Sequence, residues 1–138
     1  MDILLVEDNL GDIGLIKLCF KKLGLLNTLQ IVSDGIQAID YLKHQGKYID
    51  SNVPSLILLD LNLPKKNGHE VLEEIKKDTN LKNIPVVMLT TSSSESDINK
   101  SYSLGVNSYI IKPIDFDRFM EIIETIAKYW LNIVKLPD

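Results

Sequence analysis

Short apolar runs alternate along this chain with segments whose apolar residues recur at helical spacing. The apolar runs are residues 3–6, 29–32, 56–59, 86–89 and 109–111. Helical spacing covers residues 10–23, 35–42, 69–77, 95–104 and 116–134. Such alternation is typical of repeated strand–helix units around a parallel sheet. We therefore predict a doubly wound α/β fold: a five-stranded parallel sheet in the flavodoxin-like order 2-1-3-4-5, with five helices.

Nothing in the sequence divides the chain into separate parts. Its 138 residues include no repeat, low-complexity stretch or interdomain linker. Hydrophobic residues make up 45% and charged residues 25%, which is ordinary for a folded globular protein. We expect residues 1–138 to form a single domain.

Composition also excludes several classes of protein. A net charge of -4 argues against a nucleic-acid binder, which usually carries a concentrated basic face. No apolar run approaches the roughly 18 residues of a membrane span, and the amino terminus lacks the basic start of a signal peptide. The single cysteine, Cys19, cannot form an intramolecular disulfide and suits a reducing compartment. We expect a cytoplasmic protein that binds neither nucleic acid nor membrane.

Polar residues with chemical capacity follow most of the predicted strands. The first strand ends in Glu7 and Asp8, the third in Asp60, the fourth in Thr90 and the fifth in Lys112. Because the carboxyl ends of parallel strands share one edge of the sheet, we expect these side chains to meet there. Ligands of open α/β sheets bind in the crevice at that edge.

These residue types suit a magnesium-dependent phosphoryl site. Carboxylates brought together repel each other unless they take up protons or bind a cation, and oxygen donors without Cys or His favour Mg²⁺. The Lys112 ammonium can pair with phosphate, and the Thr90 hydroxyl can donate to a phosphoryl oxygen. Asp60 lies between the acids and the lysine, so it is the natural nucleophile for an aspartyl phosphate. Metal and lysine would neutralise charge during an in-line transfer.

Five short segments resemble those of one protein family. They are residues 5–9 (Leu-Val-Glu-Asp-Asn), 58–64 (Leu-Leu-Asp-Leu-Asn-Leu-Pro), 67–68 (Asn-Gly), 89–90 (Leu-Thr) and 112–113 (Lys-Pro). In this order and at strand ends, they closely resemble the receiver domain of two-component response regulators over nearly the whole chain. The resemblance implies that a sensor histidine kinase donates a phosphoryl group to this chain. The phosphorylated chain then signals through changed protein–protein interactions.

The resemblance also implies a role for each site residue. Asp60 is the phosphoacceptor, and Thr90 and Lys112 are the side chains that sense the phosphoryl group. Tyr109 is the aromatic residue that changes rotamer as Thr90 moves, and the peptide before Pro113 is cis. The implied Mg²⁺ ligands are Asp8 and Asp60 directly, Glu7 through water, and Asn62 through its backbone carbonyl.

Loop and tail segments resemble a narrower group, the regulators that pair with bacterial phytochrome kinases. These segments are residues 46–48, 89–92, 129–131 and 135–137. Members of the group act without an attached output domain and often dimerise through the last helix and its neighbours. The resemblance implies a phytochrome-type kinase as a partner and a homodimer, and the downstream protein target stays unknown. Residues off the apolar face of the last helix, namely Ile122, Tyr129 and Ile133, indicate a partner surface.

Two other functions stay open from the residues alone. A phosphohydrolase with an aspartyl-phosphate intermediate would use a similar set of side chains. Against it, Asn62 stands two residues after Asp60, where such an enzyme needs an acid to protonate the leaving group. A phosphorylation-independent adaptor is the other alternative, and the intact acidic set with Lys112 argues against it.

The remaining chemically capable side chains are predicted to be structural. His44 and His69 have no partner at metal-ligand spacing, so we predict that both are surface residues. Cys19 falls on the apolar face of the first helix and is predicted to lie in the core.

Overall fold

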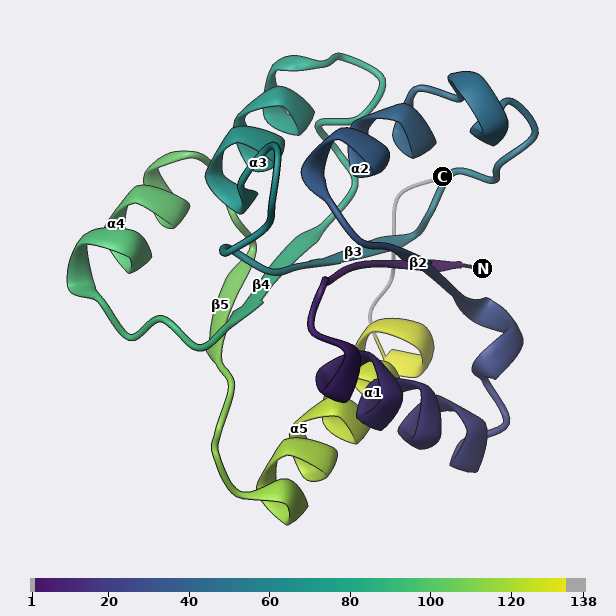
Figure 1. Cartoon of the computed structure of the whole chain (residues 1–138), viewed down its shortest axis with the longest axis vertical. Helices are drawn as coiled ribbons and strands as arrows, with labels where there is room; N and C mark the ends of the chain where they lie inside the picture. The colour runs from purple at the N-terminus through teal and green to yellow at the C-terminus, as the bar shows by residue number, and fades with distance from the viewer. Residues whose placement is uncertain (1, 134–138) are drawn as a thin grey trace.

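A computed structural model describes residues 2–133 of the chain. Its centre is a five-stranded parallel sheet in the order β2-β1-β3-β4-β5 (Figure 1). The strands are β1 (Ile3–Val6), β2 (Leu29–Val32), β3 (Leu56–Leu59), β4 (Val86–Thr90) and β5 (Ser108–Ile111). The predicted strand order is therefore confirmed.

Helices cover both faces of this sheet (Figure 1). On one face lie α1 (Leu10–Lys22) and α5 (Phe116–Lys128), and on the other lie α2 (Gly35–Leu42), α3 (Gly68–Lys77) and α4 (Glu95–Ser103). Three short helical segments are also present: η1 (Leu26–Thr28), η2 (Gly46–Tyr48) and η3 (Tyr129–Ile133). Within residues 2–133, no helix combines the length and the apolarity that crossing a membrane requires.

The central strands are apolar throughout because both of their faces are buried. Along β3, Leu56 and Leu58 pack against the layer formed by α1 and α5. The alternate residues Ile57 and Leu59 pack against the layer that includes α2 and α3. Side chains of a strand alternate between faces, so a strand between two helical layers needs an apolar residue at every position.

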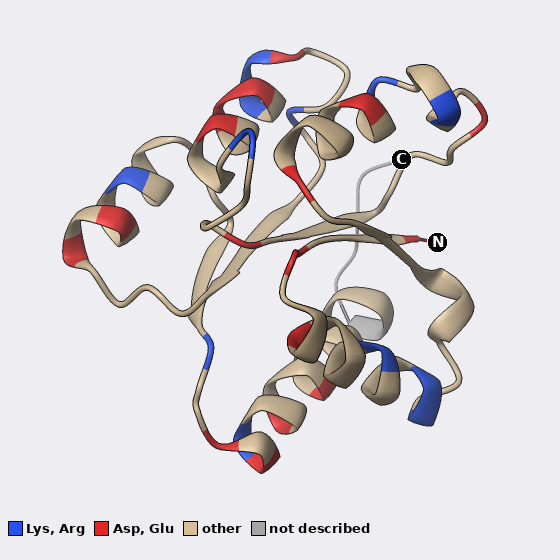
Figure 2. Ribbon diagram, in the orientation of Figure 1, with Lys and Arg blue, Asp and Glu red and all other residues tan. Residues whose placement is uncertain are grey.

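Strand register brings the carboxyl ends of the strands to one edge of the sheet. Val6 of β1 pairs with Leu59 of β3, and Thr90 of β4 pairs with Ile111 of β5. The residue that follows each of these strands therefore enters the same region. Figure 2 shows the charged residues that follow these strands: acidic segments where the chain leaves β1 and β3, and a basic segment where it leaves β5.

The last helix differs from the sequence-based expectation in its final turns. The sequence predicts one helix over residues 116–134, whereas α5 has 13 residues and continues as the five-residue π-helical segment η3. Asp115 caps α5 as predicted, because its side chain accepts the backbone N–H groups of Asp117 and Arg118. Val134 and the predicted tail segment 135–137 lie outside the described residues, as does the side chain of Ile133.

The two histidines are less exposed than predicted. His69 is buried, and its Nε2 atom lies 2.9 Å from the Ser101 hydroxyl oxygen. The prediction of a surface residue is wrong for His69 because α4 packs over the start of α3. His44 is half-buried, with Nδ1 2.9 Å from the Ser51 hydroxyl. Cys19 lies in the core as predicted.

Candidate functional site

Three carboxylates meet at the carboxyl edge of the sheet. One oxygen from each of Glu7, Asp8 and Asp60 lies within 4.8 Å of the other two. They meet because Val6 and Leu59 are paired in register, which makes the residues after β1 and β3 neighbours. Glu7 and Asp60 are buried, and Asp8 is exposed. Hard oxygen donors at this spacing fit a divalent cation that keeps part of its water shell.

The backbone around Asp60 is closely packed. The Asp60 N–H donates to the carbonyl oxygen of Val6 at 3.0 Å. Gly68 approaches from the other side, so close that a Cβ atom there would lie 2.4 Å from the Asp60 carbonyl oxygen. Only glycine allows the loop between β3 and α3 to fold back this tightly, and the loop in turn fixes the position of Asp60.

One carboxylate oxygen of Asp60 has no hydrogen-bond partner in the part of the chain that the structure describes. Its Oδ1 atom is buried, and no donor among residues 2–133 reaches it. A buried polar atom without a partner carries an energetic cost, which native proteins accept mostly at functional positions. The oxygen is therefore available to bind a cation or to form a bond with an incoming group.

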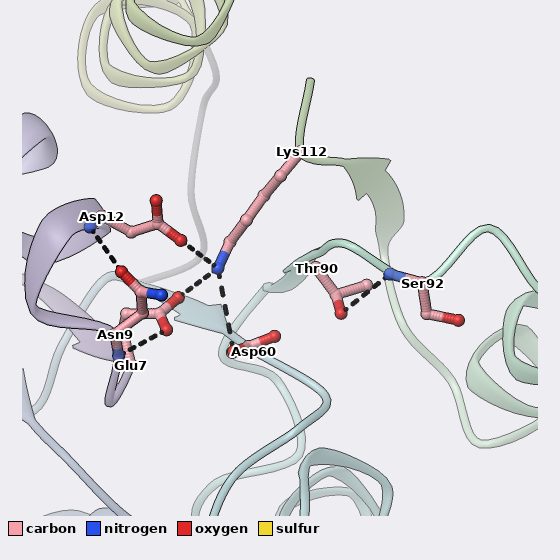
Figure 3. Close-up of polar contacts among 7 residues, drawn as sticks. All are labelled: Glu7, Asn9, Asp12, Asp60, Thr90, Ser92 and Lys112. Atoms are coloured by element: carbon pink, nitrogen blue, oxygen red, sulfur yellow. Dashed lines mark hydrogen bonds and ion pairs between the residues drawn. The ribbon is translucent and has the colours of Figure 1, made fainter. Parts of the chain in front are cut away.

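Lys112 extends from the end of β5 toward these acids (Figure 3). Its Nζ atom donates to Glu7 Oε2 at 2.5 Å and to Asp12 Oδ2 at 2.9 Å, and it lies 3.7 Å from Asp60 Oδ2. Sequence reasoning missed Asp12. The signal that could have found it is its place in the first turn of a helix that starts just after the acidic pair Glu7 and Asp8.

Burial and neighbouring charges together set the pKa values of Glu7 and Lys112. Burial raises the pKa of Glu7 to about 7, the Lys112 hydrogen bond opposes this rise, and the charge of Asp60 adds to it. Burial lowers the pKa of Lys112, but its hydrogen bonds to Glu7 and Asp12, together with the negative charges of Glu7 and Asp60, outweigh burial and hold that pKa above its usual value. Lys112 therefore stays charged near neutral pH, where Glu7 exchanges a proton.

Thr90 and Tyr109 are connected through Ser92. Thr90 is buried at the end of β4, and its Oγ1 accepts the Ser92 N–H at 3.4 Å. The Tyr109 hydroxyl donates to the Ser92 carbonyl oxygen at 2.9 Å. The Ser92 hydroxyl donates to Asp97 Oδ2 in α4 at 2.6 Å, a contact that the sequence did not indicate. A movement of Thr90 can therefore reach both β5 and α4.

Asn62 lies at the exposed side of the cluster. It lines, together with Asp8 and Asp97, a polar cavity of about 480 Å³ beside the phosphoacceptor candidate. The loop after β3 forms the floor of this cavity, and the start of α4 contributes Asp97. The cavity opens the acidic cluster to solvent.

The peptide bond before Pro113 is trans. No cis peptide occurs among the residues that the structure describes, so the cis form implied by the resemblance is corrected here. The trans isomer of such a bond is favoured by about 0.5–1 kcal/mol. With this trans peptide, Lys112 already reaches Glu7 and Asp12.

Comparison with known proteins shows that the chain is similar to response regulators. The family model for the response regulator receiver domain matches residues 3–124. The chain is 47% identical over 135 residues to the response regulator Rcp1 of Synechocystis sp., a match that covers 98% of this chain and 92% of Rcp1. It is 46% identical over 136 residues to the probable methanogenesis regulatory protein FilR2 of Methanothrix harundinacea, covering 98% and 86% of the two chains.

Solved structures agree with these sequence matches. The phosphorylated cyanobacterial phytochrome response regulator RcpA superposes with a TM-score of 0.95 at 47% identity, covering 99% of this chain and 98% of that chain. The Mn²⁺-bound form of Rcp1 superposes with a TM-score of 0.90 at 45% identity, covering 99% and 98%.

Proposed function

This chain belongs to the response regulator receiver domain family, and from that premise we propose that it is a switch set by phosphorylation of Asp60. The observation that carries the proposal is the setting of the Asp60 carboxylate. Among the described residues, its Oδ1 atom is buried without a hydrogen-bond partner. The carboxylate shares a cluster with Glu7 and Asp8, and Lys112 Nζ lies 3.7 Å from its Oδ2 atom.

The proposed donor is a phosphohistidine of a sensor histidine kinase. A carboxylate oxygen of Asp60 attacks phosphorus, an O–P bond forms, and the P–N bond breaks. The electron pair of that bond stays on the imidazole nitrogen, which takes up a proton from water. The ammonium of Lys112 opposes the negative charge on the transferring group, and the hydroxyl of Thr90, on the neighbouring strand β4, donates to one of its oxygens.

Receiver domains bind a divalent metal, and we propose Mg²⁺ for this one. Asp8 and Asp60 would be direct ligands, Glu7 would act through water, and Asn62 would add its backbone carbonyl. The all-oxygen donor set supports this choice. So does the Mn²⁺-bound structure of the similar protein Rcp1. When bound, the metal supplies positive charge to the phosphoryl oxygens.

The proposed signal leaves the site through Thr90. A charged phosphoryl oxygen on Asp60 is a strong hydrogen-bond acceptor for the Thr90 hydroxyl, and this bond draws Thr90 toward Asp60. Ser92 then loses its contact with Thr90, and the residues held by Ser92 respond. These are Tyr109 on β5 and Asp97 on α4. The surface formed by α4, β5 and α5 would thus change its affinity for partner proteins.

The proposed partners are a sensor histidine kinase, of phytochrome type, and a second copy of this chain. Likeness to the phytochrome response regulator RcpA supports the kinase. For the dimer, an open apolar cavity of about 370 Å³ lies between β5 and the end of α5, lined in part by Ile110, Ile126 and Trp130. Tyr129 beside it is 49% exposed. Ile122 packs against the core but is only partly buried. The downstream target is not identified by this geometry.

Family membership does not favour the phosphohydrolase alternative. Asn62 is an exposed amide at the position where such an enzyme needs a carboxylic acid, and an amide cannot protonate a leaving group. We propose that the chain catalyses only its own phosphorylation and dephosphorylation.

Labelling with a small phosphodonor tests the proposed function. Purified protein with Mg²⁺ and acetyl phosphate should gain one acyl phosphate, measured by intact mass and by its release with alkali or hydroxylamine. Asp60→Asn should abolish the gain. Asp117→Asn is a matched control at an exposed acid of α5 and should keep it. Labelling that persists in the Asp60→Asn protein would contradict the assignment of the phosphoacceptor.

A further inference from the structure

An acid outside the metal-binding cluster contacts the lysine of the site. We propose that Asp12 is a positioning residue that acts through Lys112: it holds the ammonium in the resting protein and competes for it with the phosphoryl group on Asp60. The proposal rests on the proposed phosphorylation of Asp60. It adds a residue that sets how readily the phosphorylated state forms.

The distances show which acids hold Lys112 in the resting state. Its Nζ atom is hydrogen-bonded to Glu7 at 2.5 Å and to Asp12 at 2.9 Å. Asp60 Oδ2 lies 3.7 Å away, which is beyond a hydrogen bond. Before phosphorylation, Lys112 is therefore hydrogen-bonded to Glu7 and Asp12 and not to the phosphoacceptor Asp60.

Asp12 is held in place by the start of α1. The Asn9 N–H donates to Glu7 Oε1 at 3.0 Å, and the Asp12 N–H donates to the Asn9 side-chain oxygen at 2.9 Å. This chain of bonds fixes the backbone of Asp12 relative to Glu7, and the carboxylates of both residues contact the same ammonium (Figure 3). Asp12 thus has a defined position and is not a freely moving surface acid.

Exposure indicates which of the two contacts yields. The Glu7 side chain is 1% exposed and the Asp12 side chain is 24% exposed. Water can replace the ammonium at the partly exposed Asp12 carboxylate, whereas it hardly reaches the buried Glu7 carboxylate. A phosphoryl group on Asp60 brings further negative charge and strong acceptor oxygens within reach of Lys112. The contact with Asp12 is then the one that Lys112 gives up.

Affinity for beryllofluoride, which mimics a phosphoryl group on Asp60, tests this competition. At saturating Mg²⁺, calorimetry should show Asp12→Asn binding it roughly two- to fivefold more tightly than the wild type, the size expected for a partly exposed ion pair. Asp12→Glu keeps the competing charge and should stay nearer to the wild type. Asp117→Asn removes an acid from the first turn of α5 instead and should leave the affinity unchanged.

A second measurement separates competition for Lys112 from simple repulsion between charges. In a crystal structure of the wild-type beryllofluoride complex, Lys112 Nζ should have left Asp12 and should contact a fluorine of the mimic. An Asp12 contact that stays at hydrogen-bond distance would overturn the proposal. So would an Asp12→Asn protein that binds the mimic no more tightly than the wild type, or equal tightening by Asp12→Glu.

The outcomes also separate this proposal from the one it rests on. A wild-type protein that neither takes label from acetyl phosphate nor binds beryllofluoride would overturn the proposed function, and the role of Asp12 with it. A wild-type protein that does both, with no tighter binding in the Asp12→Asn variant, would overturn the role of Asp12 alone.

Discussion

Lys112 donates a 2.5 Å hydrogen bond to Glu7, a residue 105 positions earlier in the chain. The two side chains are 5% and 1% exposed. In the sheet, β3 and β4 lie between the strands that carry them, so the lysine reaches across the site to make this contact. A buried ion pair is costly to desolvate and adds little net stability. Removing one of its two partners is nevertheless strongly destabilising, because the other charge is then buried without compensation. The pair therefore fixes the geometry around Asp60.

Lys112→Met should destabilise the protein in a pH-dependent way. Without the ammonium, the buried Glu7 carboxylate is uncompensated at pH 8, and we expect a loss of about 3 kcal/mol in the free energy of unfolding. At pH 5.5 Glu7 can take up a proton, because burial already raises its pKa to about 7, and the loss should be smaller. Urea unfolding in EDTA measures both values.

Lys128→Met is the matched control for this change, since its ion pair with Glu124 at 2.7 Å is exposed. Exposed pairs contribute roughly 0–1 kcal/mol, so its effect should be small at both pH values. An equal loss at pH 5.5 and pH 8 for Lys112→Met would show that Glu7 does not respond to the missing charge.

Glu7 should make the metal-free protein less stable as the pH rises. Its pKa is about 7 in the folded chain, against 4.5 for the free side chain. Between these values the folded state keeps a proton that the unfolded state has released, so the free energy of unfolding falls as the pH increases. From pH 5 to pH 7.5, Glu7→Gln should remove about 1–3 kcal/mol of this decline. Urea titrations in EDTA measure the slope, with Glu121→Gln as an exposed control.

The sequence predicted most of the sheet and the set of acids that meets at its edge. Both depend on patterns that are local in sequence. A strand buried on both faces is apolar at every position, as in residues 56–59, and parallel register then brings the next residues together. This is why the sequence alone predicts Glu7 and Asp60 as neighbours.

Contacts set by the packing of helices could not be predicted in this way. Asp12 lies in the first turn of α1, and it meets Lys112, which follows β5 and lies 100 positions later in the chain. His69 is buried because α4 covers it and supplies Ser101 as a partner. Neither contact has a periodic signal, since the two residues of each pair lie on elements whose relative placement depends on the whole core.

Gly68→Ala should disturb the site, whereas Gly14→Ala should not. A Cβ atom at residue 68 would lie 2.4 Å from the Asp60 carbonyl oxygen, a backbone atom that cannot move without shifting β3. We expect a loss of about 2 kcal/mol or more in the free energy of unfolding. Gly14 lies exposed within α1, where a Cβ meets nothing within 4 Å among residues 2–133. There alanine should add about 0.5–1 kcal/mol. Thermal and urea unfolding of both variants give the comparison.

A Gly68→Ala protein that is as stable as the wild type would show that the loop after β3 can relax. Acetyl phosphate labelling of the same two proteins extends the test to the site. Gly14→Ala should label like the wild type, and Gly68→Ala should label more slowly because Asp60 has been displaced.

Asp8→Asn should weaken metal binding and yet stabilise the metal-free protein. The Asp8 carboxylate lies within 4.8 Å of those of Glu7 and Asp60, so without a cation the three acids repel one another. Removing one charge should raise the metal-free stability by about 0.5 kcal/mol, a modest value because Asp8 is exposed. The same change removes a hard ligand and should weaken Mg²⁺ binding by about tenfold or more. Calorimetric titration with Mg²⁺ and urea unfolding in EDTA measure the two effects, and Asp117→Asn should show neither. A loss of stability without metal would mean that the acids are held together by something other than a cation.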